Sequence, residues 1–262
     1  MKRWAAIAAC WAVMPLADAR GADVRLSAPR SACLISPVGQ LHTLFGVPGG
    51  YVLGEPVRSE VLSVACGDGF TLVKTTQALE WLDAEGQLAQ SWPAPGGPAR
   101  FGLAADGARA VVYLPESGQW FLAAEGGLCP LPVGLGGRDE EVLSVALLSG
   151  DSIGAAVRRS GRYWFARVGL DSTIREEYEL AEALAPILVL THGAIAWGAG
   201  EGFMLQQQAG VRRYVPLPAP PAELTAAGER EISVQLTDGR GRLLVRLSKA
   251  GEDLYRLPEV PP

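Results

Sequence analysis

The chain has 262 residues, of which 48% are hydrophobic and 19% are charged, and its formal net charge is −5. This composition supplies enough apolar side chains for a packed core and excludes an intrinsically disordered chain. The acidic balance disfavours nucleic acid and anionic membrane surfaces as partners, so we expect neither.

The first 21 residues have the pattern of a secretory signal peptide. Lys2 and Arg3 precede an apolar run that ends at Leu16, and small residues allow cleavage after Ala19 or after Gly21. We therefore expect an exported protein, periplasmic or extracellular, with residues 22–262 as a single domain and no membrane span. A lipobox-like tetrad ends at Cys10, but the short apolar run before it disfavours a lipoprotein.

Cleavage after Ala19 removes two positive charges and one negative charge, so the formal net charge changes from −5 to −6. Three cysteines remain, Cys33, Cys66 and Cys129, in a compartment where disulfides can persist. An odd number leaves at least one thiol unpaired. The alternatives are three buried free cysteines or a single bridge, for which the fold predicted below favours Cys33 with Cys66.

A repeat is visible in the five residues VLSVA, which occur at Val61–Ala65 and again at Val142–Ala146. The two copies are 81 residues apart, twice a period near 40. A similar strand, turn and strand pattern begins halfway between them, at Phe101. A period of about 40 residues is typical of four-stranded propeller blades.

Turn glycines give a stronger test of this period, because tight hairpins often need a residue that tolerates positive φ. One series, spaced by 47, 40, 43, 41 and 41 residues, is interpreted as the turns between the third and fourth strands: Gly39, Gly86, Gly126, Gly169, Gly210 and Gly251. A second series, between the first and second strands, falls among them: Gly67, Gly107, Gly150, Gly193 and Gly228.

The two series predict an all-β fold, a β-propeller of six four-stranded antiparallel blades, with five or seven blades as alternatives. Within each blade the strands are A, B, C and D from the axis outward. The first unit is short, because the residues before Gly39 supply strands B and C only, and nothing after Tyr255 is long enough for the missing inner strand. The sequence therefore does not indicate how the ring closes.

Several local patterns bear on the strands. The segment from Ser172 to Ala185 has a capping-box pattern, but alternating apolar residues favour a strand D in its first half. Trp81, Trp120 and Trp164 recur on strand C, where we expect them to fill the wedges between blades rather than to bind ligands. Cys33 and Cys66 then belong to adjacent blades, which favours their pairing.

The stretch ALEWLDAEGQLAQSW, Ala78 to Trp92, resembles the repeat of pyrroloquinoline-quinone-type and related β-propellers. It covers one blade, and the later blades do not sustain it. The resemblance implies the propeller fold and no quinone-dependent activity. As a whole the chain is similar to uncharacterised exported bacterial propeller proteins, for which the family implies no reaction.

Catalytic and metal motifs are weak in this sequence. The stretch GDSIG, Gly150–Gly154, matches the pattern of a nucleophile elbow, but no helix follows it, so Ser152 is interpreted as the start of a strand rather than as a partner of His192. The acidic cluster Asp139–Glu141 is interpreted as a solvated turn. We expect no metal and no cofactor, since zinc, calcium, haem and nucleotide motifs are missing.

The loops between strands B and C, together with those that join successive blades, form the usual ligand face of a propeller. Arginines there suit carboxylate, phosphate or acidic-peptide recognition, unless they serve only for solubility. The candidate binding residues are Arg30, Arg158, Arg159, Arg240 and, without a counterpart in other repeats, Trp197. We expect a binding module for a protein, peptide or glycan. The alternative is a hydrolase or lyase that uses Glu116, Glu201 or Asp238.

Overall fold

The computed structural model describes residues 30–47, 50–67, 69–124, 127–208, 210–228, 230–239, 241–248 and 251–260. The predicted signal peptide, Gly126 and Arg240 lie outside these ranges. The described residues form strands, turns and loops, with no helix. Accordingly, none of them belongs to a helix long and apolar enough to cross a membrane.

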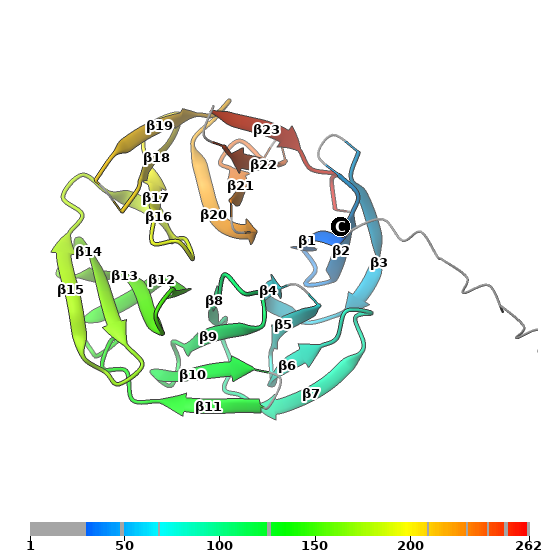
Figure 1. Ribbon diagram of the computed structural model, residues 1–262. Helices are drawn as coiled ribbons and strands as arrows, with labels where there is room; N and C mark the ends of the chain where they lie inside the picture. The colour runs from blue at the N-terminus through cyan, green and yellow to red at the C-terminus, as the bar shows by residue number, and fades with distance from the viewer. Residues whose placement is uncertain are drawn as a thin grey trace, which may run out of the picture.

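The strands form six antiparallel sheets arranged around a central axis (Figure 1), which confirms the predicted six-bladed propeller. Blade 1 contains three strands, β1 (Arg30–Ile35), β2 (Leu41–Phe45) and β3 (Val52–Arg58). Blade 2 contains β4 (Val61–Gly67), β5 (Phe70–Thr75), β6 (Ala78–Leu82) and β7 (Leu88–Pro93), and blade 3 contains β8 (Arg100–Leu103), β9 (Arg109–Leu114), β10 (Gln119–Ala124) and β11 (Gly127–Leu131).

The remaining blades have four strands each. Blade 4 contains β12 (Glu140–Leu148), β13 (Ser152–Arg159), β14 (Arg162–Gly169) and β15 (Ile174–Glu179). Blade 5 contains β16 (Leu184–Val189), β17 (Ile195–Gly198), β18 (Gly202–Gln206) and β19 (Arg212–Pro216), and blade 6 contains β20 (Pro221–Gly228), β21 (Glu231–Leu236), β22 (Arg242–Leu247) and β23 (Glu252–Arg256). The predicted strand after Ser172 is β15.

Blade 1 differs from the prediction in which of the strands A to D it contains. The spacing of the glycines predicts Gly39 in the turn between strands C and D, but it joins β1 and β2. The N–H of Val61, at the start of inner strand β4, donates to the Gly39 carbonyl at 2.9 Å. The turn therefore lies on the face where blades are joined, and β1, β2 and β3 run as strands B, C and D. The true C/D turn begins at Gly46 (φ 116°), 40 residues before Gly86, which removes the 47-residue irregularity.

The core consists of six apolar layers, one between each pair of neighbouring blades. The ring closes between blades 6 and 1, where Leu244 and Leu257 pack with Leu34 and Leu44, and the chain ends beside blade 1 (Figure 1). The sequence did not indicate how the ring closes. It closes by packing of the last blade against the first, because no single blade can bury both of its faces alone.

The tryptophans on strand C fill the wedges between blades, as predicted. Trp120 is 2% exposed and Trp81 is 9% exposed, and Trp81 stacks on Phe70 with ring centroids 4.2 Å apart. Trp164 is half-buried against the layer between blades 3 and 4. Each ring fills part of a wedge between two sheets, as large flat side chains do in repeated structures.

Candidate functional site

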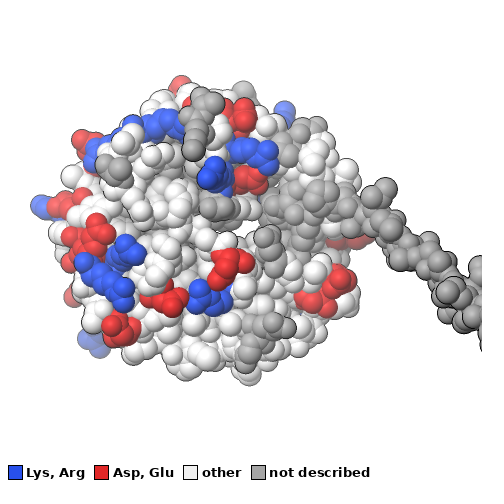
Figure 2. Space-filling model, viewed as in Figure 1, with Lys and Arg blue, Asp and Glu red and all other residues white. Residues whose placement is uncertain are grey.

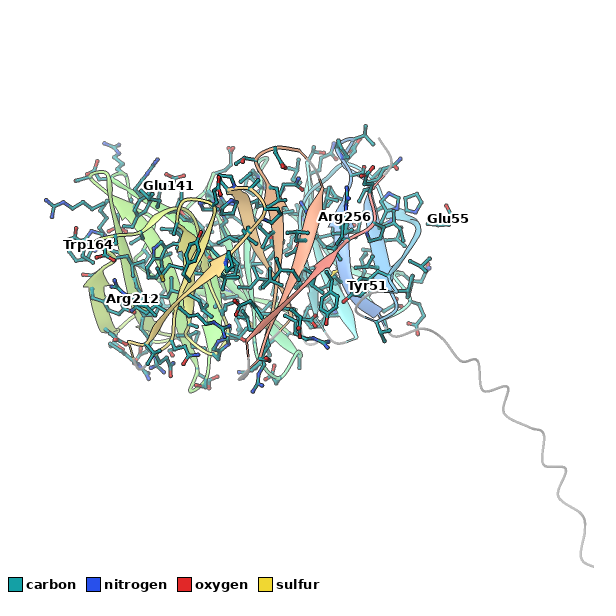
Figure 3. The ribbon with its side chains drawn as sticks, turned by 90° about the horizontal axis from the view of Figure 1, so that it is seen from above. Tyr51, Glu55, Glu141, Trp164, Arg212 and Arg256 are labelled. Atoms are coloured by element: carbon teal, nitrogen blue, oxygen red, sulfur yellow. A yellow bond between two sulfur atoms is a disulfide. The ribbon has the colours of Figure 1, made fainter. Side chains whose placement is uncertain are left out.

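Of the arginines predicted to form a binding patch, Arg240 lies outside the described residues, whereas Arg158 and Arg159 are engaged in ion pairs. Arg158 and Arg159, at the end of β13, lie directly across the sheet from Glu141 and Glu140 on β12 and form ion pairs with them. Arg159 also pairs with Glu177 at 2.6 Å. The acidic cluster at the start of β12 is therefore an ion-pair network rather than only a solvated turn, and Glu141 projects from one face of the ring (Figure 3).

The other candidate residues lie apart from this network. Arg30 begins β1 and lies toward the opposite face, because β1 runs toward the joining face. Trp197 is 3% exposed and packs between blades 4 and 5, with the Arg212 guanidinium 5.6 Å from its ring centre. This burial assigns Trp197 to the core.

Cys33 of β1 and Cys66 of β4 are joined by a disulfide, with Cα atoms 6.1 Å apart. It links blades 1 and 2, as predicted from the repeat. Cys129, on the outer strand β11, is a free and exposed thiol.

Two hydrolytic arrangements considered from the sequence have no support in the described residues. Ser152 is fully buried at the start of β13, and its hydroxyl accepts a hydrogen bond from Arg167 Nε at 2.9 Å. Glu116, Glu201 and Asp238 belong to the B/C loops of three different blades, and none of them lines either of the two cavities described below. No group of three metal-binding side chains occurs among the residues that the structure describes.

The central cavity has a volume of about 550 Å³ and is lined by strands of all six blades. Most of its lining residues are small or apolar. Three charged side chains, Arg100, Glu223 and Arg242, line it from strand ends on the joining face. Arg242 pairs with Glu223 at 3.3 Å, whereas Arg100 forms no ion pair among the described residues, and its buried Nε has no hydrogen-bond partner there.

A second pocket, of about 490 Å³, lies between blades 3 and 4 at the same face. Arg100 lines it as well, together with the exposed Arg138. Arg138 belongs to the loop between β11 and β12, and within the described part of the chain it has no acidic partner. The carboxylates of this pocket, Glu140 and Glu141, are held by arginines of β13.

A close backbone approach shapes this pocket. Gly136 has a φ of 88°, and a Cβ atom at this position would collide with the Tyr113 hydroxyl. Only glycine combines this conformation with this contact. Burial, and to a lesser extent the neighbouring Glu140, raises the pKa of Tyr113, so the phenol is neutral at physiological pH and can donate a hydrogen bond.

Lys74, on β5, is fully buried, and its ammonium donates to the Thr75 carbonyl at the B/C end of blade 2. Burial lowers its pKa, although the nearby Glu116 opposes this shift. A folded-state pKa below the unfolded value means that protonation favours the unfolded chain.

We therefore expect the free energy of unfolding to increase as pH rises toward 10.5, the ordinary lysine pKa, because in this range the unfolded chain binds the Lys74 proton more tightly than the folded one does. In the Lys74→Met variant this component of the pH dependence should be lost. Urea unfolding of both proteins across this pH range measures the difference, and parallel curves would contradict the assignment.

Comparison with known proteins extends only to the fold. No protein-family model matches the chain, and no curated protein matches it in sequence. A Porphyromonas gingivalis structure, PorZ of the type-IX secretion system, superposes with a TM-score of 0.53 and 14% identity, over 87% of this chain and 31% of that one. Hydrazine synthase of Kuenenia stuttgartiensis superposes with a TM-score of 0.53 and 13% identity, over 88% of this chain and 80% of that one.

Virginiamycin B lyase from Staphylococcus aureus gives a TM-score of 0.50 and 12% identity, over 89% of this chain and 86% of that one. These proteins have unrelated roles, and identities this low establish a common propeller architecture alone. The chain is a six-bladed β-propeller, a fold that often serves for protein interaction.

Proposed function

We propose that the protein is an exported binding module that holds an acidic group of a protein, peptide or glycan at the face where the B/C loops and the blade connections meet. The observation that carries this proposal is the pair Arg100 and Arg138, two arginines that line one pocket and have no acidic partner among the residues that the structure describes. Guanidinium groups bind carboxylates through charge-assisted, often bidentate hydrogen bonds.

The surrounding charges favour an anion at this place. The sequence has a formal net charge of −5, yet the two carboxylates beside the arginines are already neutralised by Arg158 and Arg159. On the face viewed in Figure 2, by contrast, positive and negative side chains are interspersed around the ring, with no patch of one sign. An acidic partner between blades 3 and 4 would meet two arginines, beside carboxylates that are already paired.

Export is supported by the amino-terminal pattern of Lys2, Arg3 and the apolar run that follows. The Cys33–Cys66 disulfide is consistent with an oxidising compartment such as the periplasm or the cell exterior. The proposal includes no cofactor, because the likeness of Ala78–Trp92 to pyrroloquinoline-quinone-type repeats rests on a single blade. The scattered carboxylates of the B/C loops favour binding over hydrolysis.

A hexaglutamate peptide is a direct probe of this site, with hexalysine as the control peptide. We expect hexaglutamate to bind in isothermal titration calorimetry at low salt and the Arg100→Gln/Arg138→Gln double variant to weaken binding at least about 10-fold, since each charge-assisted hydrogen bond contributes about 1.5–3 kcal/mol. Hexalysine should give no heat of binding.

The matched control is Arg175→Gln, which removes an exposed arginine from the C/D turn region of blade 4 on the other face. This variant should bind hexaglutamate as the unmodified protein does. Equal weakening by both sets of substitutions would mean that only the overall charge matters, and the site would then be wrongly placed.

A further inference from the structure

The central cavity follows the axis of the ring along almost the whole length of the inner strands (Figure 1). Its lining includes every residue of β4 from Leu62 to Gly67, and a strand segment of this length extends over about 17 Å. Its volume of about 550 Å³ lies within the range of about 300–1,000 Å³ that is usual for sites that enclose a small molecule. The cavity can therefore hold an elongated ligand.

The side wall of the cavity is mainly apolar. Leu62, Leu143 and Leu224 line it from the inner strands β4, β12 and β20, together with alanine and glycine residues of the inner strands. Leu62 is 39% exposed, and Ala226 of β20, which also lines the cavity, is exposed as well. An apolar ligand in the cavity would remove this surface from water, which favours binding.

The charged side chains of the described lining lie at one end of the cavity. Arg100, Arg242 and Glu223 line it from strand ends on the joining face, and together they give this end a net positive charge. Arg242 already pairs with Glu223 at 3.3 Å. Arg100 forms no ion pair among the described residues, and its buried Nε has no hydrogen-bond partner there. An anionic group of a ligand would supply that partner through charge-assisted hydrogen bonds.

Two hydroxyl groups line the cavity toward its other end. Thr191 follows β16 in the A/B turn of blade 5, and Ser233 lies near the start of β21, just after the A/B turn of blade 6. Neither hydroxyl has a hydrogen-bond partner within the described residues, although Ser233 is only 7% exposed and buried hydroxyl groups are normally paired. By contrast, Ser63 and Ser144 of the cavity wall accept hydrogen bonds from backbone N–H groups, each at 2.9 Å.

We propose that the central cavity binds a small molecule with a carboxylate at one end, an elongated apolar body and a hydroxyl group at the other end. The carboxylate pairs with Arg100, and the apolar body lies along the wall that contains Leu62. The distal hydroxyl of the ligand exchanges hydrogen bonds with Thr191 and with Ser233, whose side chain turns toward the ligand by rotation between staggered χ1 positions. This site goes beyond the binding of an acidic macromolecule and shares Arg100 with it, because Arg100 lines both cavities.

A series of three ligands tests each end of the site by isothermal titration calorimetry, below the concentration at which they form micelles. We expect 12-hydroxydodecanoate to bind the mature protein with one molecule per chain. Dodecanoate, which lacks the distal hydroxyl, should bind about 5-fold more weakly because one hydrogen bond is lost. The methyl ester of 12-hydroxydodecanoate has no charge and should bind at least about 10-fold more weakly. No binding of 12-hydroxydodecanoate, or equal binding of the acid and its ester, would overturn the proposal.

Paired substitutions on β20 give a second readout. Ala226→Phe places a ring in the space that the apolar body needs, so we expect binding of 12-hydroxydodecanoate to weaken at least about 10-fold. Ala222→Phe makes the same change at an exposed residue of the same strand that does not line the cavity, and this variant should bind the ligand as the unmodified protein does. Equal weakening by both substitutions would contradict binding inside the ring.

Hexaglutamate separates this proposal from the binding of an acidic macromolecule. If the unmodified protein binds hexaglutamate but not 12-hydroxydodecanoate, the cavity proposal is wrong and the pocket between blades 3 and 4 is unaffected. The reverse result supports the cavity site alone.

Discussion

Replacing Trp120 by alanine should lower the free energy of unfolding by about 3–5 kcal/mol, the range found when large aromatic side chains are removed from cores. The indole is 2% exposed and fills the layer between blades 3 and 4. It lies 4.5 Å from Tyr113 between ring centroids, and its Nε1 donates to the Leu135 carbonyl at 3.0 Å. The substitution leaves a cavity and an acceptor without its donor. Urea unfolding measures the loss.

Trp164→Ala is the matched control for this effect. Trp164 occupies the corresponding strand of the next blade but is only half-buried, near the outside of the ring in Figure 3. We expect a loss of about 1–2 kcal/mol there, because less apolar surface returns to water. If both variants lost the same stability, the wedge between blades 3 and 4 would not depend on Trp120.

The contrast between the two tryptophans illustrates what the sequence can predict. Period and glycine spacing identify the blades because each hairpin is a local structure, closed by residues a few positions apart. The period also places the tryptophans on strand C. How deeply each ring is buried depends on the side chains that pack against it from the neighbouring blade, which the period does not encode. A repeat therefore gives the fold more readily than the environment of any one residue.

Blade 1 shows how a local rule can fail. Gly39 has the positive φ of 76° that a tight turn favours, so its conformation was correctly interpreted. Its turn joins strands B and C, because a glycine signals a turn without identifying which pair of strands it joins. The irregular spacing before Gly86 was the available indication, and Gly46 restores the period at 40 residues.

The candidate site was harder to predict, for two different reasons. Glu140 and Arg159 lie almost equally far on either side of the turn at Gly150, so hairpin symmetry alone could have predicted their ion pair. Arg100 begins the inner strand of blade 3, and Arg138 lies just before the inner strand of blade 4. The two arginines share a pocket only because these blades pack side by side. The sequence alone gives no sign that these two arginines line one pocket.

Loss of the Cys33–Cys66 disulfide should lower the free energy of unfolding by about 4 kcal/mol, because the bond restricts an unfolded loop that spans 33 residues. The bond joins β1 to β4, next to the joint where blade 1 meets the end of the chain. We therefore expect Cys33→Ala/Cys66→Ala to melt well below the unmodified protein, whereas Cys129→Ala, at an exposed site, should melt close to it. Thiol titration of the unfolded, unreduced protein should find one free thiol; three would show that blades 1 and 2 are held by packing alone.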